Sequence, residues 1–159
     1  MADAPPLPHP GVRFPPPLVY AIGLAVGWAL HHWWPLRITG PGSRIRMVVA
    51  GICLVIWLAL MLGALVNFRR ARATIVTVRP AAALVTDGPY RYTRNPMYVS
   101  LVALYLGITL LVNSLWPVFL LPMVVLVIQQ AVIVREERYL AGAFPTEYAE
   151  YCERVHRWL

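Results

Sequence analysis

Apolar residues in this chain gather into four long runs, and most polar residues fall between them. The runs cover residues 18–34, 47–66, 97–112 and 115–134. As α-helices, at about 1.5 Å per residue, they would be roughly 24 to 30 Å long, close to the thickness of a bilayer's hydrocarbon core. The pattern therefore predicts an all-α integral membrane protein with four transmembrane helices.

The last two runs belong to one uncharged stretch. No charged residue occurs in the 40 positions between Arg94 and Arg135, and Asn113 with Ser114 divides them. This length is enough for two helices and a tight turn buried in lipid. We therefore predict a helical hairpin.

The segments outside the runs complete the domain organisation. Residues 1–17 contain seven prolines, so they are interpreted as an extended arm leading to a membrane domain of residues 18–159. Within that domain we expect a long loop at residues 67–96. The amphipathic spacing of residues 135–159 predicts a helical tail that folds back over the loop.

The first run is interpreted as a retained helix rather than a signal peptide, because no small-residue cleavage site follows it. Gly23 and Gly27 in this run have the spacing that lets two helices approach closely. We expect ordinary packing there.

All 14 basic residues are arginine, and the formal net charge is +7. Eleven arginines lie in the two ends and the 67–96 loop, against three between the first and second runs. By the positive-inside rule, both termini and the loop are expected to be cytoplasmic, as in the inner membrane of a prokaryote. The basicity is interpreted as topology and contact with anionic lipids rather than nucleic-acid binding.

Cysteine and histidine offer little chemistry. Cys53 lies in the second run and Cys152 in the tail, while His31 and His32 stand beside tryptophans with no further ligand near them in sequence. No disulfide and no metal site are expected.

Short motifs flank the uncharged hairpin. Residues 88–98 read GPYRYTRNPMY, and Arg135, Glu136 and Glu137 follow where the hairpin ends. Residues 144–151 then have the spacing F-x-x-E-Y-x-x-Y. Together these motifs resemble the isoprenylcysteine carboxyl methyltransferase and phospholipid methyltransferase family over roughly the second half of the chain.

The resemblance implies an integral membrane enzyme that uses S-adenosylmethionine. A tyrosine face attracts a sulfonium by cation–π interaction, and a glutamate accepts hydrogen bonds from ribose hydroxyls or an ammonium. The cofactor-binding residues that the resemblance implies are Ala82, Ala83, Leu84, Val85, Tyr90, Asn95, Pro96, Met97, Tyr98 and Glu136.

Arg94, Asn95 and Glu137 are the candidates for catalytic roles. Arg94 is expected to bind the cofactor's carboxylate or a lipid phosphate. An amine acceptor must lose a proton and Glu137 is the nearby base, whereas a carboxylate or thiolate acceptor needs none. Taken singly, Tyr90 and Tyr92 also fit interfacial anchors, and Arg91 and Arg94 fit topology signals, Arg94 then binding nothing specific. Glu136 and Glu137 fit a helix end that is salt-bridged to Arg135 and Arg138. Their combination at the family's spacing favours a site.

The chain departs from the resembled prenylcysteine enzymes at two positions. Asn95 replaces a histidine, and an amide still donates and accepts hydrogen bonds but does not become charged. Val132 replaces an arginine that contacts the substrate, and Arg135 is the nearest cation in sequence. The acceptor is therefore left open.

The expected function is isoprenylcysteine carboxyl methyltransferase-like methyl transfer to a lipophilic acceptor at the cytoplasmic membrane face. Transfer to a phospholipid amine or a small thiol, and a non-catalytic membrane scaffold, remain alternatives. A small transporter is less favoured, because the runs hold no acidic or basic residue apart from His31 and His32. The expected partners are the lipophilic substrate and membrane lipids; the oligomeric state is not indicated.

Overall fold

The computed structural model describes residues 14–70 and 84–158, and every regular element in these ranges is helical. Two short elements differ from the α-helix: η1 is a 3₁₀ helix and η2 is a π-helix. The elements in chain order are α1 (Pro16–Trp33), α2 (Arg44–Arg70), η1 (Gly88–Arg91), α3 (Pro96–Val112), α4 (Trp116–Ile128), η2 (Gln129–Ile133), α5 (Val134–Ala143) and α6 (Pro145–Arg154).

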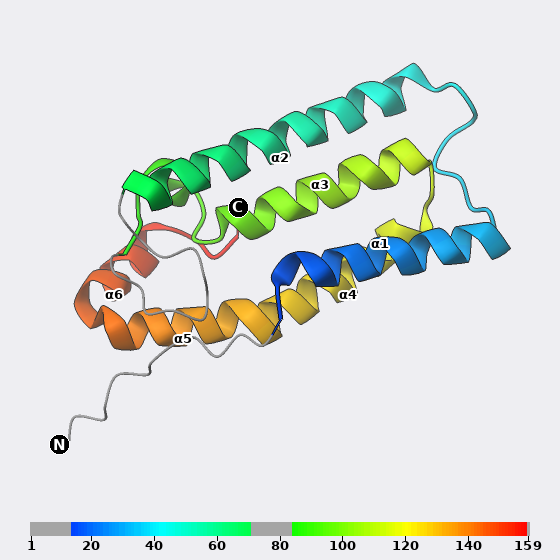
Figure 1. Ribbon diagram of the computed structural model, residues 1–159. Coiled ribbons are helices and arrows are strands. Elements are labelled where there is room, and N and C mark those ends of the chain that lie inside the picture. The colour runs from blue at the N-terminus through cyan, green and yellow to red at the C-terminus, as the bar shows by residue number, and fades with distance from the viewer. Residues whose placement is uncertain (1–13, 71–83, 159) are drawn as a thin grey trace.

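The four long helices lie lengthwise beside one another (Figure 1). Helix α2 packs along α3, α1 packs along α4, and α3 also contacts both α1 and α4. The chain therefore returns to the same end of the bundle where α2 stops, α3 begins, and α5 and α6 lie. We refer to this as the α5–α6 end.

Proline marks several of the helix starts. Pro16, Pro96, Pro117 and Pro145 stand in the first turn of α1, α3, α4 and α6. A first-turn amide has no partner inside its helix, so proline costs nothing there and its fixed φ favours the helical conformation.

The apolar surface of the bundle faces outward. Helix α2 and the continuous helix Trp116–Ala143 are each long and apolar enough to cross a membrane, and α3 is a shorter apolar helix. On α2, Ile45 is 79% exposed and Val55 is 67% exposed. Exposed apolar surface of this extent is unfavourable in water and suits lipid as the surrounding solvent.

The four predicted runs are all helical, but their boundaries differ from the prediction. Helix α2 continues to Arg70, so the predicted loop begins later than residue 67. The helix of the last predicted span continues past residue 134 into the predicted helical tail, and one helix extends from Trp116 to Ala143. Arginine and glutamate are good helix formers, so the loss of hydropathy after residue 134 does not end the helix.

Two glycines of α1 permit its close approach to α4. A Cβ at Gly23 would lie 2.6 Å from Val124 Cγ2, and one at Gly27 would lie 2.9 Å from the Pro117 nitrogen. The predicted close contact at this spacing is thus made within the chain.

Polar groups close the bundle at the end away from α5 and α6. Asn113 adopts a left-handed conformation with φ of 58° and ends α3. Its side chain accepts a hydrogen bond from the Thr39 amide at 3.1 Å and donates one to the Thr39 carbonyl at 2.9 Å. The Arg46 guanidinium donates to the carbonyls of Leu110 and Leu111 in the last turn of α3, and the Leu110 carbonyl also accepts from the Asn113 amide at 3.2 Å.

Gly27→Ala should destabilise the bundle, because the added Cβ meets the rigid ring of Pro117, 2.6 Å from its Cγ and 2.9 Å from its backbone nitrogen. Overpacking of this kind costs about 1–3 kcal/mol. Thermal melting of the detergent-solubilised protein should show a lower midpoint. Gly51→Ala on α2 is the matched control, because nothing lies within 4 Å of its added Cβ. Equal melting of the two variants would contradict the packing described.

Candidate active site

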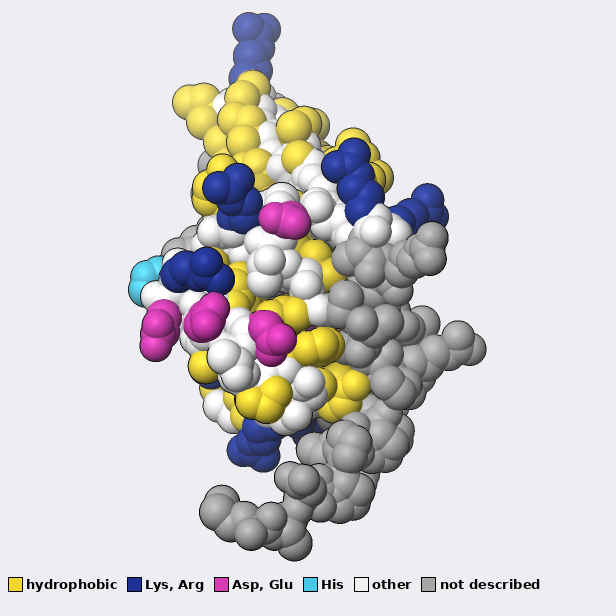
Figure 2. Space-filling model, turned by 90° about the vertical axis from the view of Figure 1, so that its left-hand side faces the viewer, with side chains coloured by type: hydrophobic (Ala, Val, Ile, Leu, Met, Phe, Trp, Pro, Cys, Tyr) yellow, Lys and Arg dark blue, Asp and Glu magenta, His cyan; other side chains and the backbone are white. Residues whose placement is uncertain are grey.

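The α5–α6 end brings together three segments that are distant in sequence. They are residues 88–98, the start of α5, and residues 155–158, which follow α6. Figure 2 views this end and shows arginine and acidic side chains sharing the surface with apolar ones. Charged groups are therefore gathered where the predicted motifs meet.

A buried tyrosine and a glutamate form the centre of this end. Tyr98 lies in the first turn of α3 and is 8% exposed. Its hydroxyl donates to Glu136, at 2.9 Å from Oε1 and 2.8 Å from Oε2. The structure thus joins two of the predicted cofactor residues across 38 positions of sequence.

The helix before the glutamates is locally widened. Helix α4 passes into the π-helix η2 before α5 begins, and Val132 and Ile133 in η2 are fully buried. A π-turn contains more residues than an α-turn, so it changes the direction in which the following side chains point. Consecutive residues of a helix then project about 100° apart, so Glu136 and Glu137 reach different partners.

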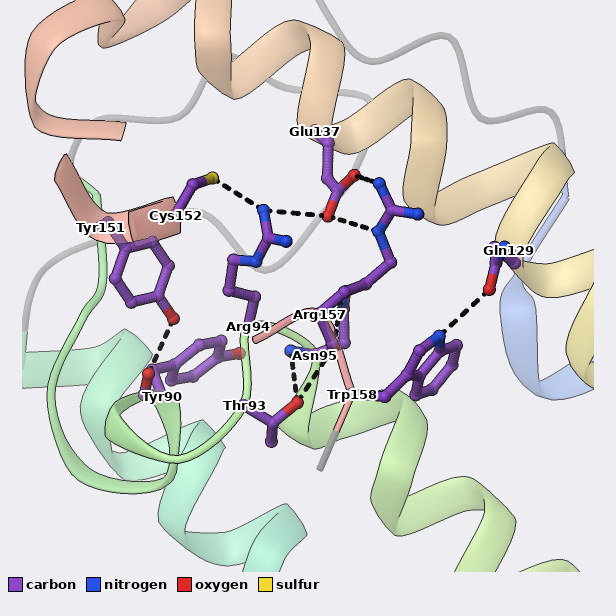
Figure 3. Close-up of polar contacts among 10 residues, drawn as sticks. All are labelled: Tyr90, Thr93, Arg94, Asn95, Gln129, Glu137, Tyr151, Cys152, Arg157 and Trp158. Carbon is purple, nitrogen blue, oxygen red and sulfur yellow. Dashed lines mark hydrogen bonds and ion pairs between the residues drawn. The ribbon is translucent and has the colours of Figure 1, made fainter. Parts of the chain in front are cut away.

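Glu137 binds two arginines. The Arg157 guanidinium donates from Nε to Oε1 at 3.0 Å and from Nη2 to Oε2 at 2.6 Å (Figure 3). Arg94 Nη1 lies 3.4 Å from Glu137 Oε1 and donates to Cys152 Sγ at 2.7 Å. The Glu137 carboxylate raises the pKa of Arg157. The two guanidinium groups therefore compensate the charge of Glu137, and this carboxylate links the two arginine side chains.

The C-terminal segment is tied to the loop before α3. The Arg94 amide donates to the His156 carbonyl at 2.9 Å, and the Arg157 carbonyl accepts from Thr93 Oγ1 at 3.1 Å and Asn95 Nδ2 at 3.0 Å. Thr93 is 1% exposed and Asn95 is 8% exposed. The Asn95 side chain therefore holds a backbone carbonyl of the chain itself.

Tyr90 is held in place through both its ring and its backbone carbonyl. Its ring meets Phe68 edge to face at a centroid distance of 5.7 Å, and its carbonyl accepts a hydrogen bond from the Tyr151 hydroxyl at 2.7 Å. Burial raises the pKa of Tyr90 well above its ordinary value, and Tyr151 and Glu136 add to the shift. The Tyr90 hydroxyl thus stays protonated, and the negative charge of Glu136 further disfavours its ionisation.

The turn before Tyr90 requires glycine. Gly88 has φ of +62°, and a Cβ there would lie 2.2 Å from the Asn67 side-chain nitrogen. Asn67 in turn donates to the Gly63 carbonyl at 2.7 Å. The end of α2 and the η1 turn therefore fit together only with glycine at position 88.

The remaining predicted site residues fall into two groups. Leu84, Val85 and Met97 pack against an apolar cluster that includes Tyr90, and Pro96 is buried at the start of α3. Ala82 and Ala83 lie outside the described residues. The structure thus places the described members of the predicted cofactor set at one end of the bundle.

Val132, which replaces an arginine of the resembled enzymes, is fully buried in the apolar core with Tyr98 and Tyr20. That position holds no cation for a substrate carboxylate.

Sequence reasoning missed Arg157, Thr93 and the contact of Trp158 with Gln129, in which the Trp158 indole donates at 3.0 Å. In the sequence, Arg157 stands only as one of the arginines that predict membrane topology. The available clue was its place at the end of the tail's apolar stripe, within reach of an acidic pair that needs cations.

The arrangement distinguishes the two adjacent glutamates chemically. Among the described residues, the ion pairs of this end go to Glu137, whereas Glu136 is held by the Tyr98 hydroxyl. A half-buried carboxylate with a neutral donor is suited to accept hydrogen bonds from ligand hydroxyls or to pair with a ligand cation. The same part of the chain contains no group of three or more His, Cys, Asp or Glu side chains that would hold a metal ion.

Curated relatives align with part of the chain. A cobalt-zinc-cadmium resistance protein, CzcN, of Cupriavidus metallidurans is 39% identical over 83 residues, which are 52% of this chain and 38% of the relative. An uncharacterized protein of Haemophilus influenzae is 46% identical over 65 residues, which are 40% of this chain and all of the relative. No solved structure matches the chain.

The family model of the phospholipid methyltransferases matches residues 45–147. The match extends from α2 into α6 and includes Tyr90, Tyr98, Glu136 and Glu137. The chain therefore belongs to the phospholipid methyltransferase family.

Proposed function

We propose that this protein is an integral membrane enzyme that transfers a methyl group from S-adenosylmethionine to a lipophilic acceptor. Its family implies a methyltransferase, and two of its helices are long and apolar enough to cross a membrane. In the proposed topology α1 and α3 also cross, because they lie alongside these two helices in the same bundle.

The distribution of arginine supports a cytoplasmic site. Described arginines at the α5–α6 end are Arg69, Arg70, Arg91, Arg94, Arg135, Arg138, Arg154 and Arg157. The opposite end has Arg37, Arg44 and Arg46. The arginine-rich side of a membrane protein faces the cytoplasm, so we assign the α5–α6 end to that side.

The pairing of Tyr98 with Glu136 is the observation that carries the proposal. A half-buried carboxylate is costly unless partners stabilise it, and among the described residues one neutral hydroxyl satisfies it only in part. A positively charged ligand with hydroxyl groups supplies what is missing. The described residues therefore fit S-adenosylmethionine, with Glu136 as its anchor and Tyr90 as an aromatic neighbour.

When bound, the cofactor supplies a methyl group on an electrophilic sulfonium. The chain's own task is to hold the reactants and exclude water, since methyl transfer is a direct displacement that gains most from positioning. Tyr90, Tyr98 and the segment at Leu84 and Val85 would form the walls. Arg94 and Asn95 would hold the loop in place.

The state of Glu137 bears on the acceptor. Both of its oxygens accept hydrogen bonds from Arg157, and Arg94 lies beside it. Because both oxygens already accept from arginine, an acceptor that needs no base is favoured, such as a prenylcysteine carboxylate or a thiolate. Isoprenylcysteine carboxyl methyltransferase-like transfer is therefore our first proposal, and a phospholipid amine is the alternative.

The purified protein should bind S-adenosylhomocysteine. Ligand at 100 times its Kd should stabilise the fold by about 2.7 kcal/mol, which thermal melting in detergent detects. Glu136→Gln should bind the ligand more weakly because it removes the anchoring charge. Glu150→Gln, on the exposed face of α6, is the control and should bind as wild type does. No stabilisation of the wild-type protein would contradict the enzyme proposal.

Tyr98→Phe should weaken S-adenosylhomocysteine binding roughly tenfold, because hydrogen bonds to charged groups contribute about 1.5–3 kcal/mol. The ring and its packing are kept, but the free protein should also melt at a lower temperature, because the Glu136 carboxylate loses its hydrogen-bond donor. Tyr92→Phe is the matched control in the same motif, because Tyr92 is 77% exposed. Calorimetric titration gives both affinities, and equal values would show that the Tyr98 hydroxyl lies outside the site.

Wild-type protein incubated with radiolabelled S-adenosylmethionine should label a lipophilic acceptor. The panel contains prenylcysteines, phospholipids with primary amines, and small thiols. Labelling of a prenylcysteine is the result we expect, and labelling of a phospholipid amine would support the alternative. Cofactor binding without labelling of any acceptor would instead favour a scaffold.

A further inference from the structure

We propose that Arg157 is the positioning residue of the methyl-transfer site, fixing Glu137 with its side chain and the loop before α3 with its carbonyl. The inference rests on the proposed function. Arg157 lies beyond the part of the chain that the family model matches, which ends at residue 147.

The side chain of Arg157 makes a two-point contact with Glu137. Two parallel N–H groups reach two oxygens, at 3.0 and 2.6 Å, and this geometry sets the rotation of the carboxylate as well as its position. The Glu137 side chain is 14% exposed, so water screens the contact only in part. Arg157 therefore determines where Glu137 points.

The carbonyl of Arg157 makes a second contact, with a different element. It accepts hydrogen bonds from Thr93 and from Asn95, and the Thr93 hydroxyl also accepts from the Asn95 amide at 3.2 Å. Asn95 immediately precedes Pro96, the first residue of α3. One residue thus holds both α5 and the start of α3, the two helices that carry Glu136 and Tyr98.

The residues on both sides of Arg157 make contacts of their own that hold this segment in place. Val155 is buried, the His156 carbonyl accepts from the Arg94 amide, and the Trp158 indole donates to Gln129 in η2. Figure 3 shows the segment lying between the loop and the α5 helix. Its position is therefore built into the fold.

The electrostatic consequence falls on Glu136. Two adjacent carboxylates repel each other, and Arg157 with Arg94 offsets the charge of Glu137. Burial is then the main cause that raises the pKa of Glu136 to about 7, the repulsion from Glu137 is the smaller one, and the ionised fraction serves a cationic ligand. Arg157 acts on that ligand through Glu137 and has no need to touch it.

Arg157→Gln should weaken S-adenosylhomocysteine binding by about tenfold or more, since it removes two charge-assisted hydrogen bonds and unmasks Glu137. Arg157→Lys should recover only part of the affinity, because an ammonium does not reproduce the two-point contact. Arg154→Gln is the control. Arg154 is exposed on α6, and its guanidinium donates to the Glu150 carbonyl of its own helix.

A double variant separates positioning from general destabilisation. If Arg157 acts through Glu137, Arg157→Gln combined with Glu137→Gln should lose less affinity than the sum of the two single losses. Additive losses, or wild-type affinity in Arg157→Gln, would overturn the inference. Failure of the wild-type protein to bind S-adenosylhomocysteine would overturn the proposed function and this inference with it.

The carbonyl contact is tested at Thr93 in case Arg157 variants fold poorly. Thr93→Val has a similar shape but lacks the hydroxyl, and Thr93→Ser keeps it. Calorimetry should show weaker S-adenosylhomocysteine binding for valine than for serine by a factor of about 5, the size of a typical neutral hydrogen bond. Equal binding by the two variants would show that the loop does not depend on the Arg157 carbonyl.

Discussion

The hydrogen bond between the Tyr98 hydroxyl and the Glu136 carboxylate is the interaction on which the rest of this structure depends. It joins the buried Tyr98 in the first turn of α3 to the half-buried Glu136 in α5. Neither group is stable there alone, because a buried carboxylate without donors is strongly unfavourable. The π-turn in η2, the proline that starts α3 and the C-terminal segment all serve to bring these two groups together.

Apolar side chains and polar contacts occupy different parts of the surrounding structure. The long helices expose apolar side chains outward, and their polar contacts concentrate at the two ends. The Thr39, Asn113 and Arg46 contacts close one end, and the network around Glu137 closes the other. This arrangement suits a bilayer, where a hydrogen bond is strong and an unpaired polar group is costly. The candidate site then lies at one end of the bundle.

Much of this could be predicted from the sequence, because the signals were strong and local. The absence of charge between Arg94 and Arg135 predicts the hairpin, and the GPYRYTRNPMY motif with the acidic pair predicts which residues meet. The rest depends on tertiary contacts. The π-turn has no local signature, and helix continuity past residue 134 reflects propensity that the loss of hydropathy concealed. Arg157 resembles any tail arginine until the fold places it on Glu137.

A structure of the protein with S-adenosylhomocysteine bound tests the central claim most directly. We predict that a Glu136 oxygen lies within hydrogen-bonding distance of the ligand while still accepting from the Tyr98 hydroxyl. A ligand bound elsewhere, or Tyr98 and Glu136 separated in the complex, would contradict the account.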